Sequence, residues 1–159
     1  MENEALKKLK EKAKDLRKRV LILTKEKEKG HLGGSFSIIE ILIWLYEKVL
    51  TEDDKFISSK GHACYPLYFL LQEKGFQPKI SVHPDIDEKN GIFATTGSLG
   101  HGLPLSVGMA LARKLLKKKG KIYVLMSDGE LEEGTTWESA LIALRFNLDN
   151  LIVIVDYNG

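Results

Sequence analysis

The chain has 159 residues, of which 43% are hydrophobic and 29% charged, fractions typical of a globular protein with one domain and a substantial core. A formal net charge of +2 gives no indication of a nucleic-acid or membrane partner. The single cysteine, Cys64, excludes an internal disulfide, and no stretch resembles a membrane span or a signal peptide. Composition therefore predicts a cytoplasmic protein that binds neither nucleic acid nor membrane.

Residues 1–29 are expected to form a charged amphipathic helix that packs on the rest of the domain, residues 30–159. Its apolar stripe consists of Ala5, Leu9, Ala13, Leu16, Val20 and Leu23. The other face carries Lys, Arg and Glu, which suits either a basic surface for nucleic acid or a solvated face with compensating ion pairs. The interleaved acidic residues and the lack of an aromatic residue on the basic face favour the solvated face.

A glycine-rich loop, GHLGGSFS, follows at residues 30–37. Its glycines allow sharp turns and a close approach of the backbone to a ligand. Ser35 or Ser37 can cap the next helix, which is predicted over residues 38–49 and expected to be buried because it is apolar nearly all round. His31 in this loop is either incidental or a proton shuttle and hydroxyl partner, and the loop alone leaves both interpretations open.

A second histidine loop, SKGHA at residues 59–63, joins a short strand at 55–58 to a helix at about 63–74 that ends at Gly75. His62 either caps this helix or contacts a ligand, and the two interpretations are equally supported. Residues 77–93 are predicted to form a loop, which contains His83 within SVHPD.

Residues 94–102, ATTGSLGHG, precede a long helix predicted over 103–118. Three glycines in six positions cost much unfolded-chain entropy, so they need a reason. One explanation is a flat ring lying against the backbone, and the other is a tight turn that lets the helix pack closely. His101 is given no catalytic role.

Residues 121–159 have the pattern strand, loop, helix, strand, loop. Two continuous apolar runs, at 122–126 and 151–155, predict a parallel pair of strands buried on both faces. Parallel strands end at one edge of the sheet, where ligands bind in such folds. We therefore expect Asp128 and Asn158, thirty positions apart, to meet at that edge.

A carboxylate and an amide oxygen are ligands that suit Mg²⁺ or Ca²⁺. Gly129 leaves room for a phosphate beside the backbone, and the helix beginning near Glu133 directs its N-terminus to the same place. These features favour a diphosphate held through a divalent cation, although two unrelated turns would have the same residues. Glu130, like its acidic neighbours, is expected to serve the dipole of that helix.

Five blocks carry a family resemblance: GHLGGSFS, SKGHA, SVHPD, TGSLG and SDGELEEG with DYN. In this order they resemble the N-terminal half of transketolases, especially the diphosphate-binding N-terminal subunit of the split type, here truncated at its C-terminal side. The resemblance covers residues 30–159 and implies a three-layer, doubly wound, mostly parallel α/β fold that binds thiamine diphosphate and Mg²⁺. The chain departs from the family at Ser127 and Val82, where glycine is usual, and at His101, where glutamine is common.

The resemblance also implies a role for individual residues. Asp128 and Asn158 would be metal ligands, and a further ligand would lie at position 160, past this sequence. The residues implied to contact the cofactor are His62, Gly97, Leu99, Gly129 and Asn158. His31 and His83 would contact the sugar substrate, and Glu133 would join a carboxylate network at the dimer interface.

The activity implied is transfer of a two-carbon ketol unit from a ketose phosphate to an aldose phosphate, as in the pentose phosphate pathway. The chain alone is expected to be inactive, because it lacks the pyrimidine-binding C-terminal subunit with which it would form a homodimer or heterotetramer. Two alternatives stay open: a subunit of another thiamine diphosphate enzyme, such as a deoxyxylulose-phosphate synthase or an oxo-acid dehydrogenase, and a non-catalytic fragment or interaction module. GHLGGSFS together with SKGHA favours transketolase.

Overall fold

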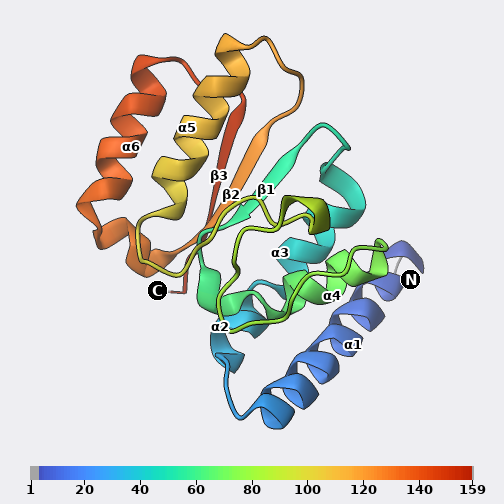
Figure 1. Ribbon diagram of the computed structural model, residues 1–159. Helices are drawn as coiled ribbons and strands as arrows, with labels where there is room; N and C mark the ends of the chain where they lie inside the picture. Colours follow the sequence, from blue (N-terminus) through green and yellow to red (C-terminus); the bar gives the residue numbers. More distant parts are fainter. Residues whose placement is uncertain (1–3, 159) are drawn as a thin grey trace.

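The computed structural model describes residues 4–158, which form a parallel β-sheet between two layers of helices (Figure 1). The strands are β1 (Lys55–Ser58), β2 (Ile122–Ser127) and β3 (Leu151–Asp156), in the order β1-β2-β3. Ser58 pairs with Leu125 and Ser127 pairs with Asp156, so the three strands run in one direction. The three-layer α/β fold with a parallel sheet, expected from the sequence, is confirmed.

The helices are divided between the two faces of the sheet (Figure 1). One face is covered by α1 (Glu4–Lys27), α2 (Leu32–Ser37), α3 (Ile39–Trp44), its π-helical continuation Leu45–Val49, and α4 (Tyr65–Glu73). The other face is covered by α5 (Gly102–Leu115) and α6 (Gly134–Arg145). Three 3₁₀ turns lie at Gly61–Ala63, Glu88–Asn90 and Asp128–Glu132. No helix in residues 4–158 combines the length and hydropathy that a membrane span requires.

Each face of the sheet has its own hydrophobic core, as the period-two alternation of strand side chains requires. Tyr123 and Leu125 of β2 pack in the core beneath α1, α3 and α4. Val124 and Met126 pack in the core beneath α5. Strand β2 is buried along its whole length, so the rim at its C-terminal end rests on a rigid element.

Helix α1 contacts α2, α3 and α4 through its apolar stripe. Four of the six stripe residues are buried, namely Ala13, Leu16, Val20 and Leu23, whereas Ala5 is exposed. Lys12 and Arg19 on its charged face form ion pairs with Glu73 of α4 at 2.8 and 2.5 Å. Part of this charged face therefore serves the packing of the helix.

Three expectations from the apolar pattern need correction. Strand β3 is not buried on both faces: Val153 is 44% exposed, because β3 is an edge strand of the described sheet and α6 packs chiefly against α5. Leu115, expected to point inward, is 74% exposed at the end of α5. The helix predicted over 38–49 changes to π-helical hydrogen bonding after Trp44, and Trp44 itself is exposed.

Candidate functional site

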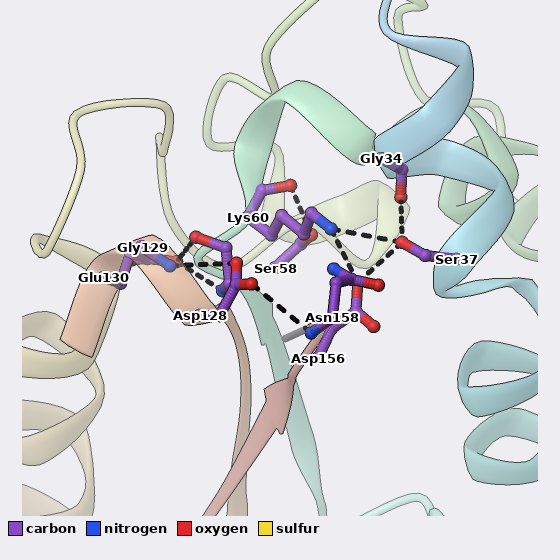
Figure 2. A network of polar contacts seen from close by, with 10 residues as sticks. Gly34, Ser37, Ser58, Lys60, Asp128, Gly129, Glu130, Asp156 and Asn158 are labelled. Atoms are coloured by element: carbon purple, nitrogen blue, oxygen red, sulfur yellow. Dashed lines mark hydrogen bonds and ion pairs between the residues drawn. The ribbon is translucent and has the colours of Figure 1, made fainter.

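Asp128 and Asn158 lie together at the C-terminal edge of the sheet (Figure 2). The pairing of Ser127 with Asp156 brings the ends of β2 and β3 level, so the residues that follow both strands share one rim. The Asn158 backbone N–H donates to Asp128 Oδ2 at 3.3 Å, and the Gly129 N–H donates to Asp128 Oδ1 at 2.9 Å. The fold thus produces the meeting expected from the two strand ends.

The chemistry of this rim fits a hard divalent cation and a diphosphate. Asp128 is half-buried and Asn158 is exposed, so a carboxylate and an amide reach the same solvent-facing space. A Cβ added to Gly129 would meet no atom within 4 Å, which leaves the backbone there open to a ligand. No group of three or more His, Cys, Asp or Glu side chains that could hold a metal exists within residues 4–158. A cation held here would therefore take ligands from water or phosphate, as Mg²⁺ usually does.

A buried polar cluster lies beside the rim and links three elements (Figure 2). Lys60 Nζ and Ser37 Oγ each donate to Asp156 Oδ2 at 2.6 Å, and Lys60 Nζ is 3.1 Å from Ser37 Oγ. Lys60 is 5% exposed and Asp156 is 7% exposed. Burial alone would raise the pKa of Asp156, but hydrogen bonds from Lys60, Ser37 and Asn158 hold that pKa below its ordinary value.

Glu130 is the centre of a second buried network. Its side chain is fully buried, and its Oε1 accepts hydrogen bonds from Ser59 Oγ and, at 3.2 Å, from the Gly100 N–H. Its Oε2 accepts from the N–H and Oγ of Ser127 at 2.8 and 3.2 Å. One carboxylate therefore ties the end of β2 to the SKGHA and TGSLG loops. Glu130 does not act chiefly on a helix dipole, as expected from the sequence, because it lies in the 3₁₀ turn before α6.

The fold brings together three histidines from three separate loops. The ring centroids of His31 and His62 are 5.2 Å apart, and those of His31 and His83 are 6.5 Å apart. Burial, then the charge of Lys60 and of the other two histidines, lowers the pKa of His62. His31 and His83 are exposed, so two of these imidazoles face solvent and the third is half-buried beneath them.

The remaining predicted site residues lie on the neighbouring loops. Gly97 has a φ of +132°, and a Cβ there would lie 2.6 Å from a ring carbon of His83. Leu99 is 46% exposed. Glu133 is half-buried and lies close to Gly100, where an added Cβ would approach its side chain to within 2.7 Å. His101 bonds only within its own loop among the contacts described, to Ser98 and Leu99.

Three buried charged residues at this rim were not assigned to the site from the sequence: Lys60, Asp156 and Glu130. For Glu130 a local signal exists, because Ser127-x-x-Glu130 matches a capping box, and both reciprocal contacts are formed. For Lys60 and Asp156 no local signal exists, because 96 positions separate them and only the order of the strands joins them.

Comparisons with known proteins agree with this geometry. Residues 10–159 match the family described as the thiamine diphosphate binding domain of transketolase. The chain is 41% identical to one of the named subunits of apulose-4-phosphate transketolase from Actinobacillus succinogenes, with 94% of this chain and 62% of that protein aligned. It is 39% identical to the 6-deoxy-6-sulfo-D-fructose transketolase subunit of a Clostridium species, with 81% of this chain and 54% of that protein aligned. The chain thus spans less than two thirds of the length of these relatives.

Solved structures lead to the same family. The transketolase of Leishmania mexicana superposes with a TM-score of 0.83 at 27% identity, over 94% of this chain and 27% of that one. The transketolase of Campylobacter jejuni superposes with a TM-score of 0.78 at 31% identity, over 92% of this chain and 28% of that one. With a family match across residues 10–159 and the fold in agreement, this chain belongs to the transketolase family, within its thiamine diphosphate binding domain.

Proposed function

We propose that this chain is the diphosphate-binding part of a transketolase, which acts with a separate pyrimidine-binding subunit. The observation that carries the proposal is the contact between Asp128 and Asn158, a carboxylate and an amide held together at the carboxyl edge of a parallel sheet. Relatives whose names describe them as single subunits of a transketolase support a divided enzyme.

In this proposal Asp128 and Asn158 hold Mg²⁺, or Ca²⁺ in its place, and the cation binds the diphosphate of the cofactor. Gly129 lies against the diphosphate, which its open side allows. His62 donates to the diphosphate from beneath. Gly97 and Leu99 lie along the aminopyrimidine side, and Glu133 joins a carboxylate network with the partner subunit.

Thiamine diphosphate, when bound, supplies the nucleophilic carbon chemistry that lets a two-carbon ketol unit leave one sugar and join another. The chain supplies orientation and proton transfer. His31 and His83 face solvent beside His62 and present ring nitrogens to the hydroxyl groups of a sugar phosphate. Because the named relatives act on different sugars, the donor and acceptor for this chain belong to a class, the ketose and aldose phosphates and their analogues.

The first test is calorimetric titration of thiamine diphosphate with Mg²⁺ into the chain, alone and mixed with a pyrimidine-binding transketolase subunit. We expect cation-dependent binding that weakens at least about 100-fold in Asp128→Ala, which removes a charged ligand. Asp149→Ala is the matched control, because Asp149 is an exposed aspartate whose described ion pair is with Lys114. No binding under either condition would contradict the proposal and favour a non-catalytic module.

The second test separates transketolase from other thiamine diphosphate enzymes. The two-subunit mixture is assayed with a ketose phosphate or with pyruvate as the donor, in the presence of an aldose phosphate. Transfer from the ketose phosphate alone supports a transketolase, whereas turnover of pyruvate supports a synthase or an oxo-acid dehydrogenase subunit. Ketol transfer by the purified chain without a partner would contradict the divided enzyme.

A further inference from the structure

We propose that Asp156, held by Lys60 and Ser37, is a positioning residue that fixes the Asn158 side chain as a ligand for a divalent cation. This inference rests on the proposed function and assigns to the buried cluster a role that sequence motifs do not give it. It concerns residues that touch neither the sugar nor the diphosphate.

The contacts of Asp156 support this role. Its Oδ2 accepts hydrogen bonds from Lys60 Nζ and Ser37 Oγ, both at 2.6 Å, so three elements of the fold determine the position of the carboxylate. The Asn158 side chain hydrogen-bonds to the same carboxylate. The Asn158 backbone N–H donates to Asp128 Oδ2 at 3.3 Å. Asn158 is therefore bound through its side chain on one side and through its backbone on the other.

The chemistry of an amide decides which end of Asn158 faces Asp156. A carboxylate only accepts hydrogen bonds, so it can bind the NH₂ end of the amide and not the carbonyl oxygen. The carbonyl oxygen is thereby left as the end available to a cation. An unrestrained asparagine rotates about χ2 over a broad range, and this contact removes that freedom before the cation binds.

Lys60 allows Asp156 to occupy this position. A carboxylate that is 7% exposed is costly to bury without a counter-charge, and the Lys60 ammonium, 5% exposed, supplies that charge. Lys60 follows β1 and Asp156 ends β3, so the ion pair also holds together the two strands that flank β2 (Figure 2). Ser37 completes the cluster from α2, and its hydroxyl lies 2.9 Å from the Gly34 carbonyl oxygen.

The test compares two uncharged versions of the cluster. Lys60→Met with Asp156→Asn removes both charges but keeps an oxygen that accepts from the Asn158 NH₂ group. Lys60→Met with Asp156→Leu removes both charges and the acceptor. Replacing a buried ion pair by neutral groups of similar volume is often tolerated, and Ser37 retains the Gly34 carbonyl oxygen as an acceptor. Both variants are first shown to be folded by circular dichroism and thermal unfolding.

The first measurement is the affinity for Mn²⁺ in the presence of thiamine diphosphate, by calorimetry and by electron paramagnetic resonance of the free ion. We expect the Asn-containing variant to stay within about threefold of wild type and the Leu-containing variant to lose about 10- to 100-fold, the usual effect of removing a group that orients a metal ligand. A purely structural role predicts equal affinities in two equally folded variants, and this result would overturn the proposal.

A second measurement needs no cation. The side-chain ¹⁵N–¹H signals of Asn158 are recorded by nuclear magnetic resonance in the cation-free chain. We expect one amide proton shifted downfield by its hydrogen bond in wild type and in the Asn-containing variant, and shifts close to those of free asparagine in the Leu-containing variant. Identical spectra in both variants contradict the role of Asp156.

The outcomes separate this inference from the function on which it rests. If wild type binds Mn²⁺ and both double variants bind equally well, the positioning role fails and the proposed function stands. If neither the wild-type chain nor its mixture with a partner binds Mn²⁺, the proposed cation site fails, and the positioning role fails with it.

Discussion

The backbone N–H of Asn158 lies 3.3 Å from a carboxylate oxygen of Asp128, although thirty positions of the chain separate the two residues. The contact depends on parallel pairing that ends β2 and β3 at the same level, Ser127 opposite Asp156. A slip of one residue in this pairing would turn every side chain of β3 to the other face of the sheet. The site therefore depends on the buried strand core as much as on its own polar groups.

Gly129→Ala should separate ligand binding from stability. No atom lies within 4 Å of the Cβ that alanine would add, so the free energy of unfolding should change by less than about 1 kcal/mol. The methyl group would occupy the space proposed for the diphosphate, so the affinity for thiamine diphosphate with Mg²⁺ should fall. Calorimetry and urea unfolding measure the two effects. Gly108→Ala, in a similarly open position on α5, should leave the affinity unchanged, and equal affinities in all three proteins would count against the assignment of Gly129.

Glu130→Ala should be strongly destabilising, by about 3 kcal/mol or more. It leaves the Ser59 and Ser127 hydroxyls and the N–H groups of Gly100 and Ser127 without the carboxylate that now accepts from them. Urea unfolding monitored by tryptophan fluorescence measures the change. Glu132→Ala, at an exposed position in the same turn, should stay within about 0.5 kcal/mol of wild type. A small effect of Glu130→Ala would show that the two loops hold together without it.

His62 should make the protein less stable in mild acid. Its pKa is lowered from the ordinary value of 6.5 by burial, then by Lys60, His31 and His83, and Glu130 opposes this shift without cancelling it. The folded protein then holds fewer protons at this residue than the unfolded chain does, so stability rises with pH between the lowered pKa and 6.5. The contribution of His62 is therefore lost as the pH falls below about 6.5 and is constant above it.

The measurement for His62 is the free energy of unfolding from pH 7.5 to pH 5, in wild type and in His62→Gln. We expect the variant to lose less stability than wild type over this range, because glutamine takes up no proton. Parallel curves for the two proteins would show that His62 is protonated equally easily in the folded and unfolded states.

The outer face of α6 should promote association of the chain. Trp137, Leu141 and Leu144 are 59%, 67% and 73% exposed, and a groove between them and β3 includes Val153. Leu144→Lys should leave the free energy of unfolding within about 0.5 kcal/mol of wild type and reduce concentration-dependent association in sedimentation velocity. Leu148→Lys, at a position that is 7% exposed, should unfold the protein. A wild-type chain that sediments as a monomer at all concentrations would contradict this prediction.

Much of the rim could be predicted because its signals are local. A continuous apolar run followed by Ser127-Asp128-Gly129 marks the end of a strand, and a second run followed by Asp156 marks another. Parallel pairing then requires the two ends to meet. The extent of burial could not be predicted in the same way, because Val153 and Leu115 have the side chains of core residues but lie at an edge strand and at a helix end.

The sequence by itself determined the fold class, the order of the elements and the five loops that carry polar residues, because hydrophobic period and glycine position act over a few neighbouring residues. Only the tertiary structure decided that Lys60 pairs with Asp156, that Glu130 joins two loops, and that His31, His62 and His83 meet. These contacts join residues far apart in the chain. They form because strand order and register bring the loops to one edge, and because a buried charge must find a partner there.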